Sequence, residues 1–259
     1  MKFLKEIRRR RDEKRAYKDS KRIQQLSQRT EYLVDENSPP SVREAFRSIK
    51  VALSVAVPKT EGGKAIFVAS AYPYAGKTMV AVNLASMFAL SNLKVVIVDV
   101  DMRRGQIAKF FRATHKKGLS EYFSGQISYE DTVRVSPINE NLSYIACGTH
   151  PPRPYELLES DQMKELIERL RKEYDYVIID TPPILILSDA LAVAPYTDGA
   201  VIVARHETTY LRDIERELEL LRFAKVNVLG AIVNGYKDAR RQREHDGYSY
   251  YYDSARKSK

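Results

Sequence analysis

The sequence has little of what exported or membrane-spanning proteins contain. Its 259 residues include a single cysteine, Cys147, which cannot form a disulfide within one chain and suits a reducing compartment. No apolar run approaches the roughly 18 to 20 residues that a membrane-spanning helix needs. The opening MKFLKEIRRRR also lacks the apolar stretch of a secretory signal. We therefore expect a cytoplasmic protein that meets the inner face of the cell membrane peripherally or through a partner.

Positive charge is concentrated at the two ends of the chain. The formal net charge is +9; residues 1–29 carry 12 lysines and arginines against 4 acidic residues, and residues 237–259 carry 7 against 4. The part between these ends is slightly acidic. We expect three regions: a basic N-terminal arm over 1–35, a folded domain over 36–236 that starts with an added helix at 41–56, and a tail over 237–259.

The basic arm contains four consecutive arginines, Arg8 to Arg11. Such a cluster suits nucleic acid, but no recognition helix or aromatic stacking platform accompanies it, so we expect no nucleic-acid partner. An anionic membrane surface or the cytosolic tail of a transmembrane protein fits better. The arm is either membrane-proximal or derived from an activator protein, and the sequence leaves open whether it is a charged helix or disordered.

Short β-branched runs alternate with longer runs of helical period between residues 64 and 236, which indicates an α/β fold with a mostly parallel sheet flanked by helices on both faces. The expected strands are 64–70, 94–100, 141–148, 175–181, 199–205 and 228–234. The expected helices are 77–92, 161–174, 188–195 and 209–226, the last with an apolar stripe of Leu211, Ile214, Leu218 and Leu221. The added N-terminal helix has an apolar face of Val42, Phe46, Ile49 and Leu53.

A strand, a turn and a helix start meet in FVASAYPYAGKTMVAVNLA, the context of a P-loop. Backbone N–H groups at a helix start hold phosphates, a lysine reaches the outer phosphates and a Ser or Thr hydroxyl binds Mg²⁺. Ala71 stands where the motif has its first glycine, and an ordinary strand-to-helix turn is the alternative. The expected nucleotide contacts are Ala71, Tyr72, Pro73, Tyr74, Ala75, Gly76, Lys77, Thr78 and Met79, with Asn234 a candidate near the adenine.

Three carboxylates follow apolar strands: Asp99 and Asp101 in KVVIVDVDMRRG, and Asp180 in DYVIIDTPP. Each alone is consistent with a turn or helix cap. Ligands of open α/β sheets bind beyond the carboxyl ends of the strands, so we expect these acids to converge near Lys77. Together with the loop they predict a site for ATP and Mg²⁺.

With these motifs in place the sequence resembles the bacterial tyrosine kinases that accompany capsule and exopolysaccharide synthesis, over roughly residues 40–259. The segments on which this resemblance rests are SAYPYAGKT, VVIVDVDMRRG, DYVIIDTPP, EAFRSIK, GTHPPRPYELL and the tyrosine tail. The resemblance implies that Lys77, Asp99, Asp101 and Asp180 are catalytic and that Thr78, Asp101 and Asp180 organise Mg²⁺. It makes Asp99 the candidate base for the attacking tyrosine, although Asp99 and Asp101 could exchange roles. Arg103 and Arg104 either reach a phosphate or face solvent.

The family most easily confused with these kinases comprises the ATPases that position division septa and partition chromosomes. Those carry a signature lysine where this chain has Tyr72, whereas Pro73 matches the kinases. Tyr74 and Ala75 depart from the glycine and acidic residue usual in the kinases, which puts the loop's affinity and turnover in doubt. The alternative function is an ATP-gated assembly ATPase that phosphorylates no protein.

The resemblance also implies assembly and autophosphorylation in trans. The expected acceptors are Tyr248, Tyr250, Tyr251 and Tyr252, on a tail whose polar composition predicts flexibility. The expected ring contacts are Glu44, Arg47 and Lys50, for which ordinary surface ion pairing is the alternative. The implied partners are further copies of the chain, a transmembrane activator or polysaccharide co-polymerase, and a cognate tyrosine phosphatase.

Overall fold

The structure is a computed structural model that describes residues 33–35, 38–59, 61–111, 113 and 117–236. The predicted basic arm lies outside these residues except for its last three positions. The predicted tail over 237–259, with its four candidate acceptor tyrosines, lies wholly outside them. Of residues 33–35, Leu33 and Val34 are buried, and the Val34 N–H donates to the Asn83 side chain at 2.7 Å.

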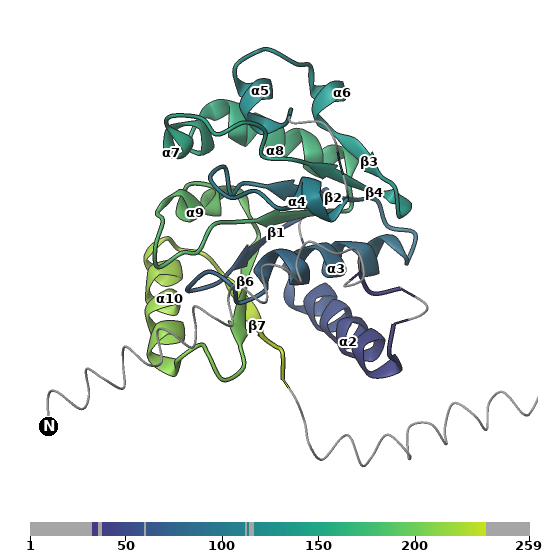
Figure 1. Ribbon diagram of the computed structural model, residues 1–259, viewed down its shortest axis with the longest axis vertical. Coiled ribbons are helices and arrows are strands. Elements are labelled where there is room, and N and C mark those ends of the chain that lie inside the picture. Colours follow the sequence, from purple (N-terminus) through teal and green to yellow (C-terminus); the bar gives the residue numbers. More distant parts are fainter. Residues whose placement is uncertain (1–32, 36–37, 60, 112, 114–116, 237–259) are drawn as a thin grey trace, which may run out of the picture.

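Seven strands form one sheet in the order β3-β4-β2-β5-β1-β6-β7 (Figure 1). Neighbours are parallel except the edge pair β3 and β4. The six predicted strands are all present, whereas β3 was not predicted, because three residues are too few to show a period. The strands are β1 Lys64–Ala69, β2 Val95–Asp99, β3 Arg134–Ser136, β4 Asn139–Ile145, β5 Tyr176–Asp180, β6 Gly199–Arg205 and β7 Val228–Asn234.

Helices cover both faces of the sheet, so the predicted fold class is confirmed (Figure 1). On one face lie α2 and α3, and on the other lie α8, α9 and α10 with the short helices α5 to α7. The helices are α2 Pro40–Ala56, α3 Lys77–Ala89, α4 Ile107–Phe110, α5 Leu119–Phe123, α6 Tyr129–Thr132, α7 Pro154–Leu158, α8 Asp161–Glu173, α9 Asp189–Ala192, the 3₁₀ turn η2 Ala194–Tyr196 and α10 Leu211–Phe223.

Helix α3 is enclosed on nearly every side. Its side chains pack against the sheet on one flank and against α2 on the other, and most of its residues are buried. A helix that is apolar all round has to be covered in this way. Of the apolar face predicted for α2, Phe46 and Leu53 are buried and Ile49 is half-buried, but Val42 is exposed.

The stripe predicted for α10 is only partly correct. Leu221 is fully buried, but Leu211 is 71% exposed. The buried positions of this helix are Asp213, Glu217 and Leu221, one turn apart. Two of the three are acidic, because the first turns of α10 face the loop that follows β1, a polar neighbour, and only its later turns face the apolar core.

Candidate active site

The loop between β1 and α3 turns sharply enough to need two left-handed residues. Gly76 precedes α3 at φ 89° and Tyr74 lies at φ 70°. A Cβ on Gly76 would meet the Asn234 amide nitrogen at 2.0 Å, so glycine serves both the turn and the close approach. Within the described residues no side chain caps α3. Its first N–H groups therefore remain available for an anion.

The first two residues of α3 bind one carboxylate of the neighbouring strand. Lys77 Nζ lies 3.1 Å from Asp180 Oδ1, and Thr78 Oγ1 donates to Asp180 Oδ2 at 2.6 Å. The Lys77 and Asp180 side chains are 8% and 1% exposed, so the pair is shielded from water. Burial raises the pKa of Asp180, and the Lys77 ammonium opposes this rise. An incoming phosphate has to compete with Asp180 for Lys77.

Asp99 lies directly beside Asp180, because the two residues end adjacent parallel strands in register. Its Oδ2 accepts the N–H groups of Gln106 and Ile107 at 2.9 and 3.0 Å, and its Oδ1 accepts that of Asp101 at 3.2 Å. Burial, followed by the charge of Asp180, raises the pKa of Asp99 well above its ordinary value. Asp99 is thus a buried group committed to the loop that follows it.

Asp101 lies two residues further on and is half-buried. Its Oδ1 accepts the N–H of Arg104 at 2.9 Å and that of Arg103 at 3.3 Å, which forms a turn. The Arg103 side chain pairs with Asp189 of α9 at 2.8 Å. Arg103 is therefore held by Asp189 with half of its side chain exposed, and the Arg104 side chain is exposed.

The predicted acids and the lysine thus lie together at the carboxyl ends of β2 and β5. Within the described part of the chain, no three His, Cys, Asp or Glu side chains form a metal-binding group by themselves. Mg²⁺ commonly takes one or two carboxylates and completes its shell with water and substrate phosphates. The Thr78 hydroxyl beside the Asp180 carboxylate supplies hard oxygen donors of that kind, so these residues fit magnesium bound together with a nucleotide.

The other predicted nucleotide contacts line the same loop. Ala71 and Ala75 are buried, Pro73, Tyr74 and Met79 are half-buried, and Tyr72 is 42% exposed. Asn234, at the end of β7, donates from its amide to the Ala75 carbonyl at 2.8 Å. Asn234 therefore supports the loop directly, and its place near the adenine stays a prediction.

Comparison with known proteins agrees with this geometry. A family model described as an AAA domain matches residues 63–225. The tyrosine-protein kinase ptk of Acinetobacter johnsonii is 35% identical over 216 residues, 83% of this chain and 28% of that protein. The tyrosine-protein kinase etk of Escherichia coli (strain K12) is 34% identical over 219 residues, 85% of this chain and 29% of that protein.

Solved structures give the deciding likeness. The kinase domain of the Escherichia coli tyrosine kinase ETK is 33% identical, with a TM-score of 0.69 over 76% of this chain and 78% of that one. The chimerical protein CapA2B2 is 30% identical, with a TM-score of 0.74 over 79% of this chain and 88% of that one. This chain belongs to the bacterial tyrosine kinase family.

The bacterial tyrosine kinase fold is shared more widely. The septum site-determining protein MinD of Pyrococcus horikoshii, solved with Mg-ADP, is 24% identical with a TM-score of 0.58 over 67% of this chain and 71% of that one, a likeness of fold alone. The chain spans less than a third of the length of the curated kinases that it matches.

The predicted assembly residues of this bacterial tyrosine kinase lie on α2, away from the site. Glu44 and Arg47 form an exposed ion pair at 3.1 Å, and the Lys50 ammonium donates to the Ser91 hydroxyl after α3. None of the helices in the described residues has both the length and the hydropathy needed to cross a membrane.

Two acids near the site were missed in the sequence. Asp189 and Glu217 lie within the predicted helices 188–195 and 209–226, and neither was singled out as a site residue. Asp189 is buried against Arg103, and Glu217 is fully buried. No sequence signal identifies either, because an acid on an amphipathic helix normally faces water.

Proposed function

We propose that this chain is an ATP-dependent protein-tyrosine kinase domain that phosphorylates the C-terminal tyrosine cluster of another copy. The observation that carries the proposal is the buried group formed by Lys77, Thr78 and Asp180, with Asp99 alongside at the carboxyl ends of two adjacent strands. Family membership supports the reaction type. Transfer breaks the bond between the γ-phosphorus and its bridging oxygen, forms a phosphate ester on the tyrosine oxygen, and releases ADP and a proton.

The residues of the loop have distinct parts in this proposal. Magnesium triphosphate, when bound, supplies the phosphoryl group and the charge that stabilises its transfer. Lys77 exchanges Asp180 for a phosphate oxygen, and the free N–H groups at the start of α3 hold the phosphates. Thr78 and Asp180, released from Lys77, supply oxygen ligands. Burial of the group excludes water, which favours transfer to a phenol over hydrolysis.

The contacts of the two aspartates support exchanging the roles first expected for them. Both oxygens of Asp99 accept backbone N–H groups, and the side chain is 1% exposed. Asp101 has an oxygen that makes none of the described hydrogen bonds, and it is more accessible to an incoming chain. We therefore assign Asp101 to orient the acceptor phenol, which is almost fully protonated at neutral pH. Asp99 fixes the loop that carries Asp101.

The acceptors proposed are Tyr248, Tyr250, Tyr251 and Tyr252 of a neighbouring copy. About 16 residues separate Asn234 from Tyr251, and a flexible chain of that length spans roughly 20 to 25 Å. The exposed face of α2 supports a ring, because Glu44, Arg47, Val51 and Val55 follow one another at three- or four-residue spacing along it. Val51 and Val55 are 55% and 82% exposed and lie one turn apart, so together they offer a small apolar surface to a neighbouring copy.

In this proposal the kinase acts in capsule or exopolysaccharide synthesis, at the inner face of the membrane. Its partners are a transmembrane activator or polysaccharide co-polymerase and a tyrosine phosphatase. The described helices contain no membrane span, so attachment is assigned to the partner or to the basic arm.

The proposal is tested by incubating the full chain with ATP and Mg²⁺ and detecting phosphotyrosine. Lys77→Met should lower labelling at least 100-fold, because it removes the charge that holds the phosphates. Lys164→Met, an exposed lysine of α8, is the matched control and should label as the unchanged chain does. Release of phosphate without any tyrosine label would instead support the assembly ATPase.

A further inference from the structure

Glu217 is a fully buried acid that the proposed reaction does not use. Its side chain is 0% exposed, and neither carboxyl oxygen has a hydrogen-bond partner among the described residues. Buried carboxyl groups are normally paired or hydrogen-bonded, because an isolated charge in an apolar interior is costly. Such an exception needs a physical account.

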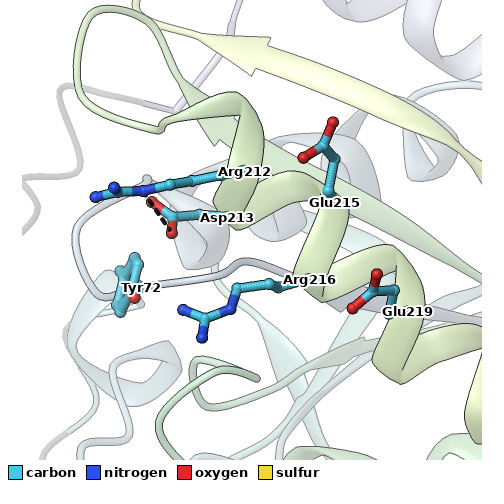
Figure 2. Close-up of a pocket in the computed structure, with 6 residues that line it drawn as sticks. All are labelled: Tyr72, Arg212, Asp213, Glu215, Arg216 and Glu219. Atoms are coloured by element: carbon cyan, nitrogen blue, oxygen red, sulfur yellow. Dashed lines mark ion pairs between the residues drawn. The ribbon is translucent and has the colours of Figure 1, made fainter.

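Glu217 lies behind the start of the phosphate loop. One turn earlier on α10, Asp213 shares a pocket of about 450 Å³ with Tyr72 of the loop, rimmed by Arg212 and Arg216 (Figure 2). The backbone amide of Ala71, next to Tyr72, stabilises the ionised form of Glu217, although neither oxygen makes a regular hydrogen bond to it. Helix α10 therefore covers the loop with two buried acids.

The surroundings of Glu217 favour its neutral form at pH 7. Burial raises its pKa to about 8, and the Ala71 amide and the Lys77 charge oppose this rise. Lys77 is the charged side chain that acts on it from another element within the described residues. On the buried face of α10 the other acid is Asp213, one turn earlier, while Glu215 and Glu219 are exposed, and β6 contributes the apolar Ala200 and Ile202 to this side of the core.

We infer that Glu217 is a positioning residue of the phosphate loop: its carboxyl is buried beside Ala71 without a hydrogen-bond partner in the described part of the chain, and the loop holds a nucleotide at full affinity while that carboxyl stays neutral. The inference rests on the proposed nucleotide site. No bond is made or broken at Glu217, and the group only holds or releases a proton.

The coupling follows from charge. A nucleotide brings several negative charges to the loop and engages Lys77, the cation that favours ionised Glu217. Both effects disfavour the ionised form, so bound nucleotide raises the pKa of Glu217 further. By linkage, affinity is full below the pKa of the free protein and falls as the pH rises through it. We expect about fivefold weaker binding at pH 9 than at pH 7.

The test measures two quantities on the full chain. The first is the amide chemical shift of Ala71 against pH without nucleotide, and the second is the affinity for Mg–ADP at pH 7 and pH 9 by calorimetry. In the unchanged chain the Ala71 amide should titrate with a midpoint near 8 and affinity should fall about fivefold. Glu217→Gln, neutral and similar in shape, should lose both effects and bind at pH 7 within about twofold of the unchanged chain.

Glu219→Gln is the matched control, an exposed acid two positions along the same helix that should keep both effects. Glu217→Met, which removes the polar group at similar length, guards against a folding defect of the first variant and should also show affinity independent of pH in this range. An Ala71 amide that does not titrate, or the same fall in affinity in Glu217→Gln, would overturn the inference. Titration of Ala71 in a chain that binds no nucleotide at either pH would reject the proposed function and the coupling, and leave the positioning role supported.

Discussion

At the scale of single residues, two aspartates separated by one position have different surroundings. Asp99 is enclosed and accepts three backbone N–H groups, whereas Asp101 makes a turn and keeps an oxygen for other ligands. Gly105 is part of the same enclosure, because a Cβ there would lie 2.9 Å from Asp99 Oδ2 and 2.2 Å from the Cys147 sulfur. The hydrogen bonds to Asp99 therefore fix the loop, and the loop leaves one oxygen of Asp101 accessible to a ligand.

We predict opposite outcomes for the two amide variants. Asp101→Asn should lower tyrosine phosphorylation at least 10-fold with the melting temperature within about 2 °C, because it removes an accessible carboxylate that takes part in little packing. Asp99→Asn should lower the melting temperature by several degrees, because its amide nitrogen would face backbone N–H groups. Phosphorylation assays and thermal unfolding of both variants check this. Equal melting temperatures with loss of activity only in Asp99→Asn would restore Asp99 as the base.

Tyr74 has a backbone conformation that favours glycine. At φ 70° a side chain costs on the order of 1 kcal/mol. Tyr74→Gly should therefore raise the melting temperature by about 2 °C, and Tyr74→Val should lower it, because a β-branched residue is strained more in this region. Tyr72→Gly is the control, since Tyr72 is not left-handed and glycine there gains nothing. A lower melting temperature in Tyr74→Gly than in Tyr72→Gly would contradict the strain.

At the scale of elements, the sequence predicts strands and helices correctly where the pattern of apolar residues matches the side chains that are buried. The strands β1, β2 and β5 are buried on both faces and read as continuous apolar runs, so their ends placed Asp99, Asp180 and Lys77 correctly. The stripe of α10 was predicted less well, because its first turns cover a polar loop and bury acids there. Whether a helix faces apolar or polar neighbours depends on the tertiary fold, which periodicity alone does not specify.

Helix α2 offers a test of assembly at the same scale. Val51→Asp should shift the chain from oligomer to monomer, because it places a further charge beside Val55 on the exposed face of α2 that we assign to the ring contact. Val135→Asp changes a valine of the edge strand β3 that is 65% exposed, against 55% for Val51, and should leave the oligomer unchanged. Sedimentation velocity of both variants decides. A Val51→Asp chain with the size distribution of the unchanged chain would remove α2 from the contact.

At the scale of the whole molecule, the proposal requires that phosphate pass between copies. We predict that a chain with all four tail tyrosines changed to Phe labels the tail of a Lys77→Met chain when the two are mixed. The first has a site without acceptors, and the second has acceptors without a working site. Mass spectrometry of the labelled peptides checks this. A Lys77→Met chain that stays unlabelled in the mixture, while the unchanged chain by itself becomes labelled, would show transfer within one copy.

Helix α3 connects the proposed assembly surface with the proposed nucleotide site, because it packs between α2 and the sheet and starts at Lys77. In the proposed kinase, a neighbouring copy that contacts α2 would therefore act on the helix whose first turn is proposed to bind the phosphates. Free-energy linkage is reciprocal, so a nucleotide that tightens subunit contact tenfold must itself be held tenfold more firmly by the assembled form. Loss of the subunit contact would then weaken the binding of nucleotide by the same factor, and helix α3 would couple the two equilibria.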